Sequence, residues 1–138
     1  MRNQKDIDRK LFHFYNMMKE NLSGGTLNLT GNINRYTVGA KELFNCKVDY
    51  FEQDPQHYLK RIEEELKSNY LFADFPIQFD TLGYWVSDNG YLFVDLGFRM
   101  SDLNDALKWA SFNGELAIWD NLRDTEINVN NFLYKFGN

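Results

Sequence analysis

The residues that most often carry out chemistry in proteins are few in this chain and lie far apart. Its two histidines fall on separate helical segments, and Cys46 is its one cysteine. The chain has no G-x-S-x-G, Walker, H-E-x-x-H or C-x-x-C motif, so neither a nucleophile nor a metal centre is indicated. The neighbouring carboxylates Asp49, Glu52 and Asp54 lack the loop pattern of a calcium site. We therefore expect a protein that is not an enzyme and needs no cofactor or metal.

One local arrangement could bind a ligand. The segment GYWVSDNGYLFVDLGF, residues 83–98, contains Asn89-Gly90, the pair typical of a two-residue β-hairpin turn. That turn would place Tyr84 opposite Asp95, on a strand face shared with Leu82, Val86 and Phe93. A carboxylate among aromatic side chains either accepts local hydrogen bonds or receives a cation from a ligand or partner. The sequence leaves both interpretations open.

A second candidate lies on the next helix, where Trp109 and Phe112 share a face with Asp102 and Asp105. Exposed aromatic residues among acidic ones are typical of protein interfaces. A second layer of the hydrophobic core would explain the same pattern.

The charge of the chain is strongly uneven. Residues 1–48 hold 8 basic and 4 acidic residues, whereas residues 49–138 hold 7 basic and 16 acidic ones. Nucleic-acid binding needs a dominant basic surface, so we expect a basic protein partner and no direct contact with nucleic acid. We predict that acidic residues of the segment 49–80 contact this partner, notably Asp49, Glu52, Asp54, Glu63 and Glu64. They could equally be a solvated helix face that keeps the protein soluble.

Size and composition predict one globular domain. The chain has 138 residues, of which 43% are hydrophobic and 25% charged, and it contains no apolar run long enough to span a membrane. Its N-terminus, MRNQKDIDRK, has no signal-peptide core. A single cysteine fits a reducing compartment. We expect a cytoplasmic protein that could form a homo-oligomer.

Hydrophobic periodicity predicts alternating helices and paired strands. An amphipathic helix spans residues 4–22, and a second begins at Asp54-Pro55, a favourable N-terminal pair. A third helix covers residues 102–113. The other elements are a hairpin of 26–30 with 35–40, an unplaced segment 41–53 that could include a strand, a loop at 71–80, the hairpin 83–98, the strand pair ELAIWD and TEINV, and a tail 131–138. This order predicts an α+β domain with a mostly antiparallel sheet built from hairpins, and about three helices packed mainly on one face. Residues 26–130 would form its core.

Several motifs resemble a pattern found in small, mostly uncharacterised phage and prophage proteins. They are a Gly-Gly-x-Thr strand, a Gly-x-Trp hairpin and an Asn-x-x-Ala-Ile-Trp-Asp strand. The residues that match best are Gly83, Trp85, Asp95, Asp105, Ala106, Asn113, Ala117, Ile118, Trp119 and Asp120. Glu115 stands where the pattern has Gln.

The resemblance implies a phage-type accessory protein that binds and blocks a host antiviral defence complex through its acidic surface. A CRISPR effector nuclease, with its basic channel, is the expected target, which would make this chain a nucleic-acid mimic. Two alternatives remain. One is a sponge for a nucleotide defence signal that uses Arg35, Arg99 and Arg123 for phosphate. The other is a structural or replication accessory protein without a defence role.

Overall fold

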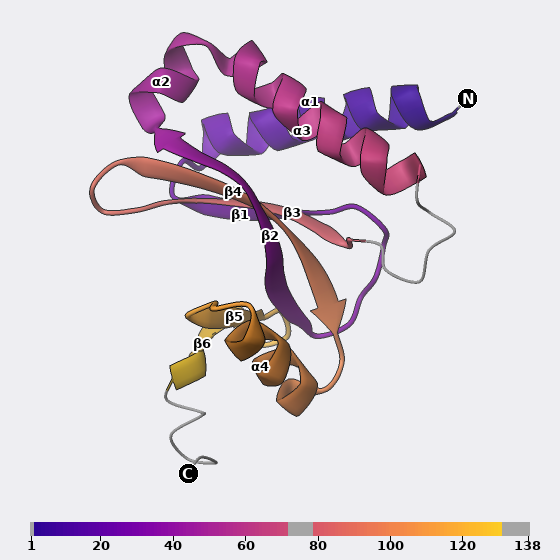
Figure 1. Ribbon diagram of the computed structural model, residues 1–138, viewed down its shortest axis with the longest axis vertical. Helices are drawn as coiled ribbons and strands as arrows, with labels where there is room; N and C mark the ends of the chain where they lie inside the picture. Colours follow the sequence, from indigo (N-terminus) through magenta and orange to yellow (C-terminus); the bar gives the residue numbers. More distant parts are fainter. Residues whose placement is uncertain (1, 72–78, 131–138) are drawn as a thin grey trace.

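The computed structural model describes residues 2–71 and 79–130 of the chain. This part forms an α+β fold of four helices and six strands in one curled antiparallel sheet (Figure 1). The helices are α1 (Arg2–Glu20), α2 (Val48–Gln53), α3 (Pro55–Leu71) and α4 (Leu103–Phe112). The strands are β1 (Gly24–Asn28), β2 (Tyr36–Lys47), β3 (Thr81–Val86), β4 (Tyr91–Met100), β5 (Ala117–Asp120) and β6 (Thr125–Asn128). The predicted fold class is confirmed.

Strand order in the sheet is β1-β3-β4-β2-β5-β6. The predicted hairpins β3–β4 and β5–β6 are confirmed. The predicted pairing of residues 26–30 with 35–40 is wrong, because β1 pairs with β3 whereas β2 pairs with β4 and β5. Alternation identifies a strand but not its partner, and here both partners are distant in sequence. Within segment 41–53, the chain continues β2 to Lys47 and then forms α2. The predicted loop 71–80 and the tail 131–138 fall mostly or wholly outside the described residues.

A first hydrophobic cluster joins α1 and α3 to the sheet. Each helix contributes one apolar stripe, as its amphipathic pattern predicts. The buried side chains of the first cluster are Ile7, Phe14, Met18, Leu43, Phe44, Cys46, Phe51, Leu59, Ile62, Leu66, Leu82, Tyr84, Leu92, Val94 and Leu96. Fully burying a side chain of this size contributes roughly 1.5–3 kcal/mol. This cluster is therefore the main source of stability.

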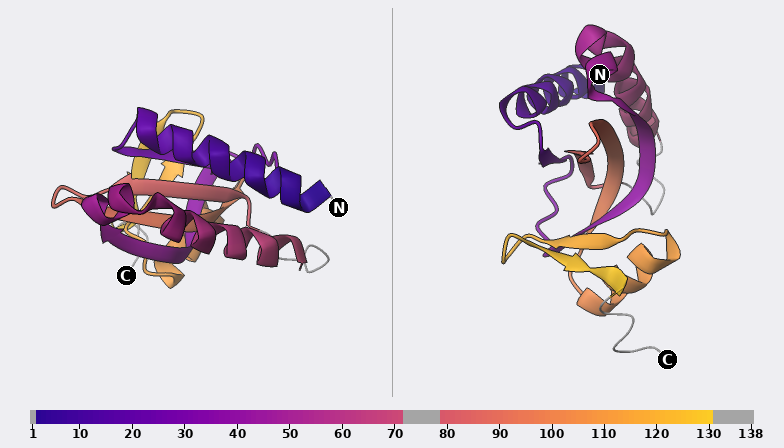
Figure 2. Two further views of the ribbon diagram at one scale, coloured as in Figure 1. Left: turned by 90° about the horizontal axis from the view of Figure 1, so that it is seen from above. Right: turned by 90° about the vertical axis from the view of Figure 1, so that its left-hand side faces the viewer.

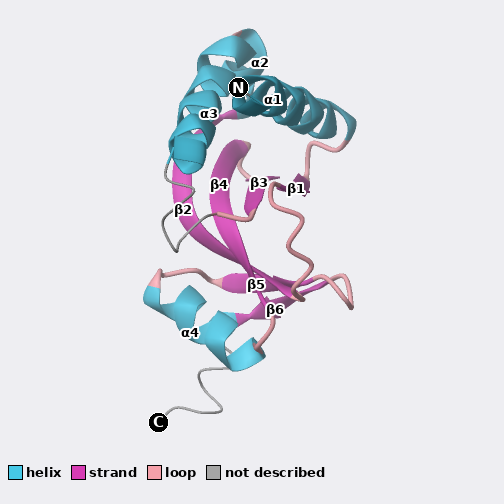
Figure 3. Ribbon diagram, turned by 90° about the vertical axis from the view of Figure 1, so that its right-hand side faces the viewer, coloured by secondary structure: helices cyan, strands magenta, loops and turns pink. Residues whose placement is uncertain are grey.

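A second cluster joins α4 to the other end of the sheet. Ala106, Leu107 and Ala110 of the helix meet Val38 of β2 and Ile118 of β5. The Asp102 side chain caps α4 by accepting a hydrogen bond from the Asn104 N–H at 2.8 Å. Both clusters lie on the same face of the sheet. Every second residue of β4 points to that face, and this row of side chains runs from the first cluster to the second: Leu92, Val94, Leu96 and Phe98. Figures 2 and 3 show the helices outside the curl and β5–β6 turned back beneath the other strands.

The long strand β2 causes much of this curl. Its 12 residues pair with the 10 residues of β4, so β2 holds two surplus residues, Ala40 and Leu43, at two register shifts. A β-bulge of this kind bends the strand and increases its twist. The bends bring β5 and β6 round toward the first four strands.

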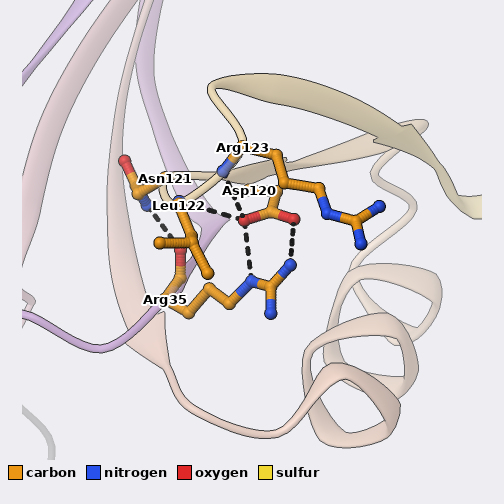
Figure 4. A network of polar contacts seen from close by, with 5 residues as sticks. All are labelled: Arg35, Asp120, Asn121, Leu122 and Arg123. Carbon is orange, nitrogen blue, oxygen red and sulfur yellow. Dashed lines mark hydrogen bonds and ion pairs between the residues drawn. The ribbon is translucent and has the colours of Figure 1, made fainter.

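An ion pair fixes the β5–β6 turn to the start of β2 (Figure 4). Arg35 donates from Nε and from its terminal nitrogen to the two carboxylate oxygens of Asp120, both at 2.8 Å. The backbone N–H groups of Leu122 and Arg123 donate to the same carboxylate. Asn121 donates to the Arg35 carbonyl oxygen. The hydrogen bonds from Arg35 lower the pKa of Asp120 to about 2. No helix of the described chain is both long and apolar enough to cross a membrane.

The variant Asp120→Asn tests this anchor. The pKa of Asp120 is about 2 in the folded protein and about 3.9 in an unfolded chain, so its ionised form stabilises the fold above pH ~4, and this is lost as pH falls through ~2. We expect the variant to melt several degrees lower than the parent at pH 7 and at the same temperature below pH ~2. Circular dichroism melts would measure this. Asp124→Asn, an exposed neighbour in the same turn, is the control, and an equal fall there would contradict the prediction.

Candidate functional site

The inner face of the curled sheet carries no helix among the described residues. Three rows of side chains cross it from β1 to β2, as the strand register shows. The first row holds Trp85 and Phe93, and the second holds Thr26, Gly83, Asp95 and Glu42. The third row holds Thr81, Gly97 and Gly39. Neighbouring rows are two residues, about 7 Å, apart along β3 and β4. Along β2, Gly39 and Glu42 are three residues apart because Ala40 is surplus.

The observed register corrects the predicted hairpin. Tyr84 lies opposite Val94, and Asp95 lies opposite Gly83. The loop has three residues, Asp88–Gly90, because Ser87 and not Asp88 pairs with Tyr91. Gly90 closes this loop with a positive φ of 84°. Since a shift of one residue moves every side chain to the other face, Tyr84 and Asp95 face opposite ways.

Tyr84 belongs to the hydrophobic core. Only 3% of it is exposed, and its ring meets Phe14 edge-on at 5.5 Å. Its hydroxyl donates to the carbonyl oxygens of Met17 and Asn21 near the end of α1. Tyr84 therefore anchors the helix, and Asp95 alone of the predicted pair is left on the inner face.

A cleft of about 630 Å³ occupies this inner face. The strands β1 to β4 form its floor, and β5, β6 and the α4–β5 loop form its opposite wall. Trp85, Phe93 and Trp119 line it with aromatic rings. Of the described residues that line it, none is basic and four are acidic: Glu42, Asp95, Glu115 and Glu126. A volume of 300–1,000 Å³ is the usual size of a ligand pocket.

Glycines clear the space around Asp95. A methyl group at Gly83 would lie 3.0 Å from Asp95 Oδ1, and one at Gly39 would lie 3.1 Å from Asp95 Oδ2. The same methyl group at Gly39 would lie 2.8 Å from Glu115 Oε1. The two carboxylates therefore meet over Gly39, although Asp95 comes from β4 and Glu115 from the loop after α4. Glycine inside a strand often marks such a close approach.

A bulge places the third carboxylate. Val38 packs in the second cluster, so simple alternation along β2 would put Glu42 in the core as well. The surplus residue Ala40 reverses the alternation, and Glu42 lines the cleft opposite Asp95. Lys41 then points to the outer face, where its Nζ lies 3.0 Å from Glu65 of α3.

The site holds negative charge that no described cation balances. Burial, followed by the nearby carboxylates of Glu115 and Glu42, raises the pKa of Asp95 to about 7. The pKa of Glu115 is raised as well, mainly by burial and to a smaller extent by the carboxylate of Glu42. The ion pairs of the described chain are Asp6–Lys10, Arg35–Asp120, Lys41–Glu65 and Glu63–Lys67, and none includes a cleft carboxylate.

The predicted pair Trp109 and Phe112 divides between core and surface. Trp109 packs against the second cluster, and its ring meets Phe98 edge-on at 5.4 Å. Phe112 is 88% exposed and does not line the cleft. One ring is thus packed against the core and the other is in solvent at the end of α4, so they do not form one exposed aromatic patch.

The predicted acidic surface lies on the outer, helical side. Asp49 and Glu52 are exposed on α2, and Asp54 is exposed between α2 and α3. Glu64 is exposed on α3, whereas Glu63 is half-buried beside Lys67, with 3.4 Å between Oε1 and Nζ. The sheet separates all of these residues from the cleft.

Sequence reasoning missed Glu42, Glu115 and Trp119 as members of a site. Trp119 and Glu115 lie in the segment that resembles phage proteins, but no motif marks any of the three as part of a site, because they reach the cleft through a bulge, a loop and a distant hairpin. The available signal was the set of glycines inside strands, Gly39, Gly83 and Gly97, which marks a face kept clear of side chains.

Comparison with known proteins gives no relative from which to transfer a role, since no protein-family model, curated protein or solved structure matches the chain. The resemblance to phage proteins therefore stays an expectation. Among the described residues, no three histidine, cysteine or acidic side chains are placed to hold a metal ion. The geometry suits an organic cation, which can contact carboxylates and aromatic rings together.

The variant Asp95→Asn tests the electrostatics of the cleft through stability. The pKa of Asp95 is raised to about 7 when folded against about 3.9 unfolded, so its protonated form stabilises the fold below pH ~4, and this is lost as pH rises to ~7. The neutral amide avoids that loss. We expect the variant to match the parent near pH 4 and to exceed its free energy of unfolding by on the order of 2 kcal/mol at pH 8, allowing for partial exposure.

Urea unfolding at several pH values would measure the difference. Asp88→Asn, an exposed carboxyl in the same hairpin, is the control and should show no such trend. A parent protein that is the more stable of the two at pH 8 would contradict the prediction.

Proposed function

We propose that this chain is a binding protein that holds a positively charged group of a basic partner in its inner cleft. The observation that carries the proposal is the meeting of Asp95 and Glu115 over Gly39, beside Glu42, without a described cation to balance them. A bound cation would relieve this repulsion. The aromatic lining would contribute cation–π and apolar contacts.

The stability cost supports a binding role. Repulsion between like charges and burial of a carboxyl both destabilise a fold, and nothing in the described chain compensates for them. Natural proteins retain such costs where function needs them. A cation bound in the folded state alone would repay the cost by mass action.

The partner class agrees with the charge of the chain. A basic protein would be attracted at long range by the acidic residues of α2 and α3 and of the cleft alike. A special case of this proposal is that the chain binds and blocks a host defence complex, such as a CRISPR effector nuclease. The test for that case is whether the protein slows cleavage by the purified nuclease and whether Asp95→Asn slows it less.

Nucleotide binding is less favoured. A phosphate would face four carboxylates in the cleft. Of the arginines expected to receive it, Arg35 pairs with Asp120 and Arg99 donates to the Asn34 carbonyl oxygen. Neither lines the cleft.

Matched carboxylate variants would locate the binding surface. We expect Asp95→Asn and Glu115→Gln each to weaken binding of a fluorescent peptide of alternating arginine, lysine and glycine by ~10-fold, because each removes a partly buried partner of the cation. Glu52→Gln and Glu64→Gln, on the outer helices, should leave affinity unchanged at moderate salt. Fluorescence anisotropy would measure all four. Loss of binding in the helix variants alone would place the contact on the outer acidic surface and refute the cleft.

Binding should also depend on pH in one direction. The pKa of Asp95 is about 7 without a partner, and only its ionised form attracts a cation, so affinity should rise as pH increases through ~7. The groups that face it are Glu42 from β2 and Glu115 from the α4–β5 loop. We expect affinity for the same peptide to rise ~5-fold or more from pH 5.5 to pH 8 in the parent. The rise should be much smaller in Asp95→Asn, and an equal rise would contradict the assignment to Asp95.

A further inference from the structure

The strand β1 forms a free edge of the sheet (Figure 3). At the two ends of its pairing with β3, Ser23 accepts a hydrogen bond from Val86, and Leu29 donates one across the same ladder. Backbone groups alternate in direction along an antiparallel strand. Gly24 and Thr26 therefore direct their N–H and C=O groups away from β3, where no described strand pairs with them.

The sequence of β1 leaves this edge open to pairing. Sheet edges in proteins are usually protected by a charged residue, a proline or a bulge. The five residues of β1, GGTLN, include no charge and no proline, and their register with β3 is continuous. On the outer face, Leu27 packs against the first cluster and holds the strand in place. The edge is thus extended, fixed and unprotected.

Gly24 leaves one face of the Trp85 ring uncovered. The ring of Phe93 stacks on the opposite face, with centroids 4.3 Å apart and planes 8° from parallel. Gly24 lies opposite Trp85 on β1, and a methyl group there would be 3.6 Å from the Cβ of Trp85. Trp85 is consequently 49% exposed. A side chain on a strand paired with β1 can cross the glycine and cover this ring, as aromatic side chains do with glycines of edge strands.

The next row of the inner face leads from β1 to the carboxylate of Asp95. Thr26 lies opposite Gly83, which lies opposite Asp95. A methyl group at Gly83 would be 3.0 Å from Asp95 Oδ1, so the carboxylate lies beside Gly83. A residue paired with Thr26 would have its Cα two strand spacings, about 10 Å, from this carboxylate. An extended arginine side chain, with its hydrogen bond to the carboxylate, can span this distance.

We infer that β1 accepts an extended segment of the basic partner as a further strand, with an apolar residue over Trp85 and a basic residue, two positions away, directed to Asp95. This inference rests on the proposed function and adds the form in which the partner binds. Main-chain hydrogen bonds to Gly24 and Thr26 would supply affinity, and the alternate side chains would supply specificity.

A second copy of the chain suits this edge less well. Two β1 strands paired about a two-fold axis would place both inner faces on one side of a joint sheet. The carboxylates of both clefts would then face the same space, and each chain carries a net charge of −5. A basic segment brings the opposite charge to the same position.

A six-residue peptide, acetylated and amidated Thr-Thr-Arg-Thr-Val-Thr, tests the inference. In antiparallel pairing, its arginine lies opposite Thr26 and its valine opposite Gly24, and both direct their N–H groups to β1. The threonine between them directs its N–H group to solvent. At pH 8 and low salt, we expect N-methylation of the arginine or the valine to weaken binding at least ~5-fold, and N-methylation of that threonine to change it by less than ~2-fold. NMR titration would measure the affinities.

Hydrogen exchange and a proline variant would locate the contact. Exchange of the Gly24 and Thr26 amides should slow when the peptide binds, whereas the amides of Gly25 and Leu27, which face β3, should change little. Thr26→Pro removes one edge N–H group, at a position where an edge strand tolerates proline. Thr26→Val keeps that group and should bind the peptide at least ~5-fold more tightly than Thr26→Pro. Amide spectra would report whether both variants retain the fold.

The outcomes separate the two proposals. Equal binding of all N-methylated forms, with binding lost when citrulline replaces arginine, would overturn strand pairing and leave the cation cleft standing. Slowed exchange at Gly24 and Thr26 with equal affinity for the citrulline peptide would refute the proposed function and, with it, the basic partner. If no peptide slows exchange at these amides, the inference is wrong. Slow exchange without peptide, together with a dimer in sedimentation, would assign the edge to a second copy and also overturn it.

Discussion

The pairing of β2 with β4 is the interaction on which the rest of the structure depends. These two central strands carry side chains of both hydrophobic clusters, so the helices α1 and α3 and the helix α4 are held together through them. β2 also pairs with β5, and the fork between Arg35 and Asp120 fixes that contact at its end. Because β2 is longer than its partner, the sheet curls, and this curvature turns one of its faces into a cleft.

The two faces of the sheet are packed differently, and this difference explains why the site lies on the inner face. All the described helices cover the outer face, where burial of large apolar side chains supplies the stability. The inner face bears glycines, carboxylates and aromatic rings, which stabilise little by themselves. A carboxyl such as Asp95 weakens the fold at neutral pH, since its raised pKa reflects the cost of ionising it there. The strong outer core permits this cost.

Local features of the sequence predicted the elements well. The amphipathic stripes of α1 and α3, the position of α4 and the strand pair β5–β6 follow from short-range patterns, and all were correct in kind. The partner of β1 was not predictable, because strand pairing depends on contacts between residues far apart in sequence. The Asn89-Gly90 signal correctly marked a turn but not its length. One extra loop residue was enough to place Tyr84 and Asp95 on opposite faces of the sheet.

The candidate site was predicted only in part. Asp95 and the possibility of a partner cation could be inferred from the sequence, whereas Tyr84, Trp109 and Phe112 have other positions or roles. Glu42 could not be assigned, since counting alternate residues from Val38 gives the wrong face unless the bulge at Ala40 is known. Glu115 reaches Asp95 from a different part of the chain, and only the three-dimensional fold brings the two together.

The surplus residues of β2 have a consequence for how this protein could diversify. Ala40 and Leu43 lie opposite no residue of β4. Leu43 is buried in the first hydrophobic cluster, whereas deleting Ala40 would leave every existing strand pair and the direction of every neighbouring side chain unchanged. What would change is the bend of β2, because a strand without a bulge is straighter and less twisted. A single-residue deletion or insertion at Ala40 would therefore adjust the width of the cleft independently of the chemistry that lines it. Related chains could accept partners of different thickness while keeping the same carboxylates and rings.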